Sequence, residues 1–326
     1  MSETSAEFGR RRFLLAATAV TVAGSLSVAS PAGAVDAGRA ATRAREVRRA
    51  GRPMLGSRPV GPFRVTPLLD ASGPFFLDRQ QAFPEATPQD WESARAVDPG
   101  AFGPGETWHL DFRCFAIRGP RDRLTLVDAG VGPADSPASG WAPVPGRLPA
   151  ELDLAGIDPA DVDTVVLTHL HEDHFGWSVA PDGTPMFPNA RYVVQRREVA
   201  ALTADEAAMT YVVDPLRATG QLDEADGAAR LATVGRGAGG WIGVVPTPGH
   251  TPGHQSVVVD GGGRQLIVTG DVLVHAVQLV DPGVGYRFEA DPEAARRSRQ
   301  WLLAQARARG AVLATAHLTR PWIDVG

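Results

Sequence analysis

The chain has 326 residues, enough for one large domain or two domains of ordinary size. Hydrophobic residues make up 44% of it, which is ample for a globular core. The formal net charge is −5 and the Arg residues are scattered, whereas nucleic-acid-binding proteins gather positive charge on one face. We therefore expect no nucleic-acid partner. A single cysteine, Cys114, excludes an intramolecular disulfide and suits a buried position in a strand.

The N-terminal residues resemble a targeting signal. Residues 10–15 read Arg-Arg-Arg-Phe-Leu-Leu, a twin-arginine pattern, and a modestly apolar run follows over 16–30. Ala32-Gly33-Ala34 is a small-x-small cleavage site, and the apolar run is shorter than the ~20 residues that a membrane-spanning helix needs. We expect a signal peptide over 1–34 and secretion, or export to the cell envelope, by the twin-arginine route, although an uncleaved anchor stays open. The mature chain should then have no membrane partner. Residues 35–60, rich in Ala and Arg, are expected to form a linker or arm.

After the arm, strand-like and helix-like segments alternate. Apolar or alternating runs predict strands over 63–69, 108–117, 124–127, 165–167, 191–195, 241–245, 255–260, 264–269 and 311–316. Helices are predicted over 148–156, 196–202 and 292–309, the last ending at Gly310. Two segments, 70–106 and 203–240, have no clear period. Their roles stay open, with a substrate pocket suggested for the first and a lid for the second.

Metal-ligand residue types cluster directly after the strand predicted over 165–167. The chain has only eight His, yet His169, His171 and His174 fall within six positions, with Asp173 between the last two. Imidazole nitrogens and carboxylate oxygens are the ligands of zinc and its neighbours. Ligand sites collect at the strand ends of open α/β sheets. The sequence therefore predicts a metal site on a loop at this sheet edge.

This H-x-H-x-D-H run resembles the signature of the metallo-β-lactamase-fold hydrolases. The other ligands expected of that family follow in order, as His250, Asp271 and His317, each after an apolar run. The resemblance extends from about residue 63 to the C-terminus. It implies an α/β (α+β) fold, a four-layer αβ/βα sandwich, and a hydrolase domain over 61–326.

The resemblance also implies a role for each ligand. His169, His171 and His250 would hold a first metal ion, and Asp173, His174 and His317 a second, with Asp271 bridging the two. The expected cofactor is two Zn²⁺, with other divalent metals possible. A shared water would become a hydroxide nucleophile, because metal coordination lowers its pKa to about 7. Asp173 and Asp271 are therefore also the expected catalytic residues, Asp173 by orienting the hydroxide or passing a proton.

Three further polar residues are expected near this site. By resemblance Asp128, in a turn after the strand over 124–127, would hold the second nitrogen of a metal-binding imidazole, although a simple turn role is as good a reading. His254 and His275 are expected to have structural or pocket-lining roles, because the ligand set is complete without them.

The resulting hypothesis is an exported binuclear zinc hydrolase that cleaves a lactone, ester or phosphotriester small molecule, similar to the lactonase and methyl-parathion-hydrolase-like branches. One alternative is a mononuclear iron oxygenase of the persulfide-dioxygenase type, which would leave the second metal position unused. Others are a β-lactamase or thioesterase variant and an inert metal-binding sensor. Substrate identity, the metal used in the cell and the oligomeric state stay open.

Overall fold

A computed structural model of the chain describes residues 56–180, 182–234 and 239–325. The predicted signal peptide and residues 35–55 of the predicted arm lie outside these ranges. Among the residues that the structure describes, no helix is long and apolar enough to cross a membrane.

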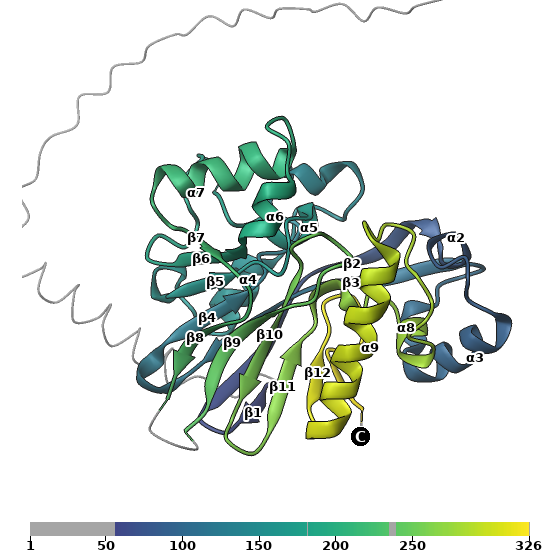
Figure 1. The fold of residues 1–326 in the computed structure, drawn as a ribbon. Helices are drawn as coiled ribbons and strands as arrows, with labels where there is room; N and C mark the ends of the chain where they lie inside the picture. The colour runs from purple at the N-terminus through teal and green to yellow at the C-terminus, as the bar shows by residue number, and fades with distance from the viewer. Residues whose placement is uncertain (1–55, 181, 235–238, 326) are drawn as a thin grey trace, which may run out of the picture. The chain divides into compact units, whose positions relative to one another are not determined.

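The first sheet has seven strands that lie side by side in sequence order (Figure 1). They are β1 (Arg58–Val60), β2 (Phe63–Asp78), β3 (Thr107–Arg118), β4 (Leu124–Val127), β5 (Thr164–Val166), β6 (Arg191–Gln195) and β7 (Leu222–Ala225). Strands β1 to β4 pair antiparallel, and β4 to β7 pair parallel. Parallel neighbours end at the same edge, so the loop after β5 opens at the edge where β4 and β6 also end.

The second sheet has six strands in the order β13-β12-β11-β10-β9-β8. They are β8 (Ala229–Thr233), β9 (Trp241–Pro246), β10 (Gln255–Asp260), β11 (Gln265–Val268), β12 (Val312–Ala314) and β13 (Trp322–Asp324). All pairs are antiparallel except β11 with β12. That parallel pair requires a crossover, and the crossover contains the longest helix.

The helices are α2 (Arg79–Ala82), α3 (Pro88–Val97), α4 (Leu148–Leu154), α5 (Glu172–Phe175), α6 (Arg196–Ala201), α7 (Asp214–Ala218), α8 (Val277–Val280) and α9 (Pro292–Arg309). Helix α9 begins where the Asp291 side chain accepts a hydrogen bond from the amide of Ala294, with Pro292 in the first turn. It ends at Gly310, whose φ of +56° lies in the left-handed region that favours glycine. Both limits agree with the prediction.

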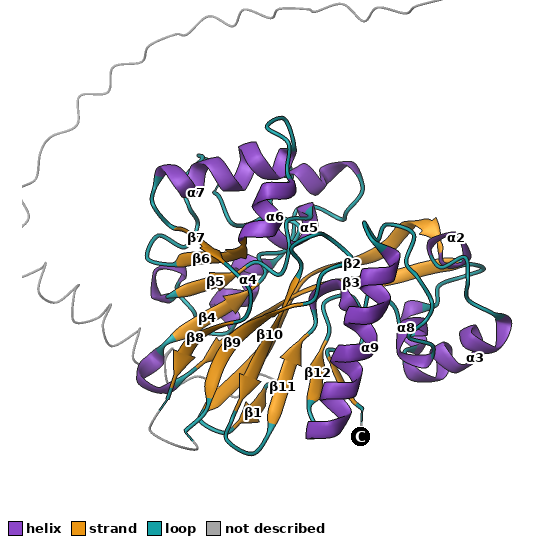
Figure 2. Ribbon diagram, in the orientation of Figure 1, coloured by secondary structure: helices purple, strands orange, loops and turns teal. Residues whose placement is uncertain are grey.

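Four layers result from three apolar interfaces (Figure 2). The two sheets pack face to face through a buried cluster that includes Val65, Ile117 and Val166 of the first sheet and Val244 and Val257 of the second. Side chains of α4, α6 and α7 cover the outer face of the first sheet, and side chains of α9 cover that of the second. The α/β sandwich predicted from the resemblance is therefore confirmed.

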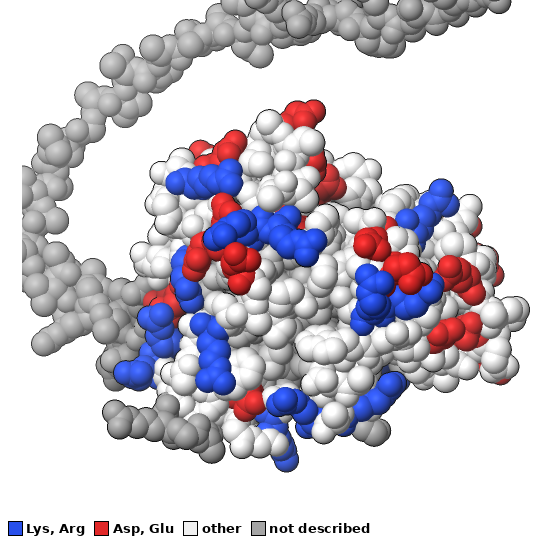
Figure 3. All heavy atoms as spheres, viewed as in Figure 1, with Lys and Arg blue, Asp and Glu red and all other residues white. Residues whose placement is uncertain are grey.

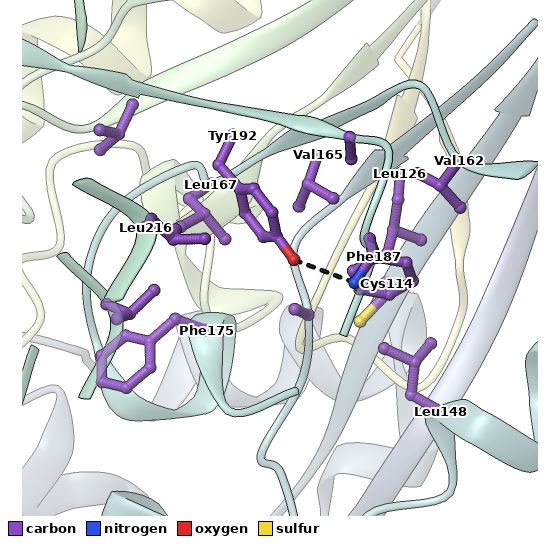
Figure 4. Close-up of a cluster of buried hydrophobic side chains, with 14 of the residues drawn as sticks. Cys114, Leu126, Leu148, Val162, Val165, Leu167, Phe175, Phe187, Tyr192 and Leu216 are labelled. Atoms are coloured by element: carbon purple, nitrogen blue, oxygen red, sulfur yellow. Dashed lines mark hydrogen bonds between the residues drawn. The ribbon is translucent and has the colours of Figure 1, made fainter. Parts of the chain in front are cut away.

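Figure 4 shows part of the cluster on the outer face of the first sheet. Tyr192 of β6 is fully buried there, and its hydroxyl accepts a hydrogen bond from the Phe187 amide at 3.3 Å. Cys114 of β3 is buried in the same cluster, as expected of a lone cysteine in a strand. Burial raises the pKa of its thiol well above the usual range, which makes it a packing residue.

Several elements differ from the predictions. Strand β1 covers the last three residues of the expected arm, and helices α2 and α3 occupy the segment 70–106. The segment 203–240, considered as a lid, contains β7 and β8, an edge strand of each sheet. Both edge strands are only half buried, so their sequences lack the apolar alternation that marks a core strand.

Candidate metal centre

The first four predicted ligands follow β5 within six residues. His169 and His171 lie on the loop, but Asp173 and His174 belong to the short helix α5, which corrects the prediction that the whole motif is a loop. His171 has extended backbone angles at the position before α5, and Glu172 and Asp173 stand in its first turn. Acidic side chains there are favoured by the helix dipole. The turn brings the side chain of His174 back towards that of His169, with ring centroids 4.1 Å apart.

The other three ligands come from the second half of the chain. His250 lies on the loop between β9 and β10, Asp271 in a short turn after β11, and His317 after β12. All three are at least nine-tenths buried. The structure thus brings all seven predicted ligands together, from strand ends of both sheets, into overlapping groups whose ligand atoms lie within 4.8 Å of one another.

The first group consists of three imidazoles. His169 Nε2 lies 3.0 Å and His250 Nε2 2.9 Å from His171 Nδ1. Burial, together with the neighbouring imidazoles, holds the pKa values of His169 and His250 well below the usual histidine value. Neutral imidazoles whose nitrogens converge on one point are the ligand set of a transition-metal ion.

The second group combines two imidazoles with a carboxylate. Asp173 Oδ2 lies 3.4 Å from His174 Nε2 and 3.5 Å from His317 Nε2, and the two Nε2 atoms are 3.3 Å apart. Burial opposes a charge on His174 and His317, but nearby carboxylates outweigh it and raise the pKa values of both. This part of the site therefore attracts positive charge.

Asp271 lies between the two groups. Its Oδ2 is 3.2 Å from His250 Nε2, and its Oδ1 is 3.2 Å from His174 Nε2 and 3.1 Å from His317 Nε2. Oδ1 is buried, and no donor of the described residues reaches it with the geometry of a hydrogen bond. A buried carboxylate oxygen without a donor is costly, and a cation between it and the imidazoles would satisfy it. The residues therefore fit metal ions in both groups, with Asp271 shared.

Hydrogen bonds behind the ligands aim the correct nitrogens inward. His174 Nδ1 lies 2.9 Å from Asp128 Oδ2, and His317 Nδ1 lies 2.8 Å from the carbonyl oxygen of Asp111. Each acceptor requires a proton on Nδ1, which leaves Nε2 free to bind a metal. The hydroxyl of Thr168 donates to Asp128 at 3.0 Å and so accepts from His169 Nδ1 at 3.1 Å. Asp128 thus holds an imidazole and also ties its own turn to Thr168.

His254 and His275 lie outside the ligand groups. His254 Nε2 accepts a hydrogen bond from the Asp271 amide at 2.9 Å, and burial lowers the pKa of His254 to about 4. It therefore braces the turn that carries Asp271. His275 is enclosed by aromatic rings, including Phe83 and Trp108, and does not line the cavity described below. Its Nδ1 accepts from the Val277 amide at 3.0 Å, which is a structural role.

Glu198 supports this centre, and no motif in the sequence marks it. Its side chain leaves α6 and is buried, with Oε1 accepting from the Leu170 amide at 2.9 Å and Oε2 from the Gly253 amide at 2.8 Å. Leu170 separates two ligands of the first motif, and Gly253 follows His250 in the second. A side chain at position 253 would clash with the backbone of Glu198, so glycine is required there. One carboxylate therefore joins the two ligand loops.

The metal centre opens into a cavity of about 610 Å³, a volume typical of small-molecule sites. The segments of unknown role both line it, the first through Phe75 and Phe76 and the second through Glu206. Trp141, Tyr286 and Phe288 also line it, and sequence reasoning missed all three. They lie on irregular segments between helices and strands, so their positions in the sequence show no periodicity.

Comparison with known proteins identifies the family. The profile of the Metallo-beta-lactamase superfamily matches residues 113–317, which contain all seven candidate ligands. The chain belongs to this superfamily. Within the superfamily it is 32% identical over 241 residues to the N-acyl homoserine lactonase AttM of Azorhizobium caulinodans, a match that covers 68% of this chain and 86% of the relative.

Solved structures of the metallo-beta-lactamase superfamily agree on the fold. The hydrolase AbOPH superposes with a TM-score of 0.65 at 24% identity, covering 82% of this chain and 91% of that one. AidC, described as a dizinc quorum-quenching lactonase in complex with a product, has a TM-score of 0.64 at 19% identity and covers 82% and 96% of the two chains. The predicted family, fold and enzyme class are confirmed: the protein is a hydrolase of this superfamily, and it is similar to proteins that are named lactonases.

Proposed function

We propose that the protein is an exported binuclear zinc hydrolase that cleaves a lactone, ester or phosphotriester of small size and without negative charge. One observation carries the proposal: two ligand groups share Asp271 and open into one largely apolar cavity. The names of its relatives support it. AttM is called an N-acyl homoserine lactonase, and AidC is called a dizinc lactonase.

The chain's own residues suit hydrolysis at this position. The two ligand groups would hold divalent ions, which would supply Lewis acidity and would lower the pKa of water at this position towards about 7. Asp271 presents one oxygen to each group and so sets their spacing. Asp173 lines the cavity and is placed to carry a proton to the leaving group.

Tyr286 adds a hydroxyl to the cavity wall. Its ring stacks on His250 with centroids 6.0 Å apart and planes 13° apart. Burial, with the charges of Asp271 and Asp173, raises the pKa of Tyr286 well above its usual value. The hydroxyl therefore stays protonated at neutral pH and can donate a hydrogen bond to a substrate oxygen.

The charge of the cavity argues against anionic substrates. Apart from the metal centre, the charged residues that line it in the described part of the chain are Glu172 and Glu206, without any Arg. Figure 3 shows that Arg and acidic side chains are interspersed on the face in view. A β-lactam carboxylate, a glutathione thioester or a nucleic acid would meet repulsion from the two glutamates. A neutral lactone, ester or phosphotriester would not.

The alternative hypothesis, a mononuclear iron oxygenase, requires only the first ligand group of His169, His171 and His250. The intact second group of Asp173, His174 and His317, aimed by Asp128 and the Asp111 carbonyl, favours the binuclear hydrolase. Elemental analysis of the purified protein separates the two readings. Two equivalents of zinc are expected, and one equivalent of iron without zinc would refute the binuclear assignment.

Activity is tested on a panel of an N-acyl lactone, an aryl ester, a phosphotriester, a thioester and a β-lactam. We expect turnover of at least one of the first three by the zinc-loaded chain, lost on chelation and restored by metal. Turnover of the β-lactam alone would overturn the proposed substrate class. No turnover with both metals bound would overturn the hydrolytic function.

We propose export on the basis of the twin-arginine pattern alone, which lies outside the described residues. Replacing Arg10 and Arg11 by Lys should retain the protein in the cytoplasm, as measured by cell fractionation. Export at the normal level by this variant would refute the route.

A further inference from the structure

One side of the cavity is an aromatic wall formed by Phe75, Phe76, Trp141 and Phe288. Phe75 and Phe76 have ring centroids 4.2 Å apart, and Trp141 meets them nearly edge-on at 6.1 and 6.2 Å. Phe288 lies 5.9 Å from Phe76. Phe76 and Phe288 are 56% and 42% exposed, although both line the cavity. These rings therefore present surface to an incoming ligand.

A carboxylate is fixed within this wall. Glu172 stands between the candidate ligands His171 and Asp173 but belongs to neither ligand group. Its Oε2 accepts a hydrogen bond from Trp141 Nε1 at 2.7 Å, and both residues line the cavity. Glu206 lines the same cavity, with its Oε1 bound by the amide and hydroxyl of Thr203 at 2.8 and 2.9 Å. Each glutamate keeps a second oxygen that no side chain of the described residues occupies with a hydrogen bond.

Aromatic faces combined with carboxylates favour one class of ligand group. A cation is attracted by ring faces, and quaternary ammonium groups are bound in such aromatic sites. A purely apolar group would pack on the rings, but it would remove water from the carboxylates without offering them a hydrogen bond or a positive charge. An anion would be repelled by both glutamates. An organic cation would interact favourably with both the aromatic rings and the two carboxylates.

We propose that the aromatic wall, with Glu172 and Glu206, binds an alkylammonium group of the substrate while its ester or lactone group lies at the metal centre. The inference rests on the proposed hydrolytic function and narrows it to substrates that carry a tertiary or quaternary ammonium group. The cavity volume leaves room for both parts.

Binding is tested first with a pair of probes of the same shape. Choline and 3,3-dimethylbutan-1-ol differ only in a charged nitrogen that replaces a carbon atom. Calorimetric titration of the metal-loaded full chain should show roughly tenfold tighter binding of choline. Equal or weaker binding of choline would overturn the proposal, whether or not any substrate is hydrolysed.

Variants then locate the binding site. Glu172→Gln combined with Glu206→Gln should reduce the preference for choline to less than about twofold. Trp141→Leu should weaken choline binding several-fold. Glu92→Gln is the matched control, since Glu92 is exposed on α3 and does not line the cavity, and it should leave the preference unchanged. A preference that survives the double substitution would place the cation elsewhere and refute the assignment.

Hydrolysis of the matching esters separates this inference from the proposed function. The acetate of choline should have a kcat/KM roughly tenfold above that of 3,3-dimethylbutyl acetate. If both esters are cleaved at equal rates, the hydrolase stands and the cation site fails. If choline binds preferentially and no ester, lactone or phosphotriester is cleaved, the cation site stands and the proposed reaction fails.

Discussion

The metal centre and the aromatic wall share one cavity but are held in place by different forces. At the centre, buried hydrogen bonds from Asp128, Thr168, His254 and Glu198 fix ligands that come from both sheets. In the wall, Phe76 and Phe288 are exposed and are held by ring contacts with each other and with Phe75, which itself packs on the buried Trp108. The positions of the metal ligands are thus held rigidly. The exposed rings of the wall, which would select the substrate, can be replaced with little effect on the fold.

The largest effect is expected at the residue shared by the two ligand groups. Asp271→Asn keeps the shape and the backbone amide that His254 binds but removes the negative charge between the groups. We expect loss of at least one metal equivalent and a fall in kcat on the order of 1,000-fold or more. Metal content and kcat are measured together with Asp324→Asn, an exposed position, as control. Wild-type rates with full metal content would show that Asp271 is not shared by the metals.

Glu198 tests whether the rigidity of the centre comes from its supporting hydrogen bonds. Glu198→Gln replaces one of the two carboxylate oxygens by an NH₂ group. The backbone N–H of either Leu170 or Gly253 would then face a donor and lose its hydrogen bond. Changes in such supporting residues typically weaken metal binding about 10- to 100-fold, and we expect that range here. Competition with a chelator measures the affinity, and Glu293→Gln on the exposed side of α9 is the control. An affinity within twofold of wild type would mean that the two loops hold their ligands without this link.

The contrast between the metal centre and the aromatic wall also explains which residues could be predicted from the sequence. Ligands of a metal must be of a few residue types, and they follow core strands whose apolar runs are easily recognised. Hence the family resemblance of the first motif is clear, and that resemblance implies His169, His250 and Asp271 as ligands together with the four-layer fold. Within the ligand motifs, the difference from the prediction is the short helix α5, which forms where a loop was expected.

The wall and the supporting contacts could not be predicted for a physical reason. Phe75, Trp141 and Phe288 meet only after folding, and an aromatic residue in an irregular segment has no periodicity. Glu198 has the residue type of any helix surface, and its burial depends on two backbone amides from distant loops. Edge strands β7 and β8 were missed because half-buried strands lack a core pattern.

His275 tests the packing behind the wall, where Trp108 and Phe83 contact its ring. Burial, with a smaller effect of Arg79, lowers the pKa of His275 to about 3. The unfolded chain, with a histidine pKa of about 6.5, therefore binds more protons between these values, so the free energy of unfolding falls as pH falls below about 6.5. Between pH 7.5 and pH 5 this one residue should account for about 2 kcal/mol.

The measurement is denaturant unfolding of wild type and His275→Asn at both pH values. Asn retains an acceptor for the Val277 amide but does not titrate, so the variant should lose about 2 kcal/mol less stability on acidification. Its stability at pH 7.5 should be lower because the ring leaves a cavity. An identical pH dependence in both proteins would mean that the histidine is not buried in its neutral form.

The smallest effect is expected in the wall itself. Phe288→Ala removes an exposed ring that contacts Phe76 and Tyr286. Loss of apolar contact worth about 1 kcal/mol should lower kcat/KM roughly fivefold, mainly through KM, for whichever substrate is cleaved. Metal affinity should not change, because the ring contacts of Phe288 within the described residues are with Phe75, Phe76 and Tyr286, none of which is a candidate metal ligand. A parallel loss of metal affinity would show that Tyr286, which stacks on His250, transmits the change from the wall to the centre, and the two regions would then be one mechanical unit.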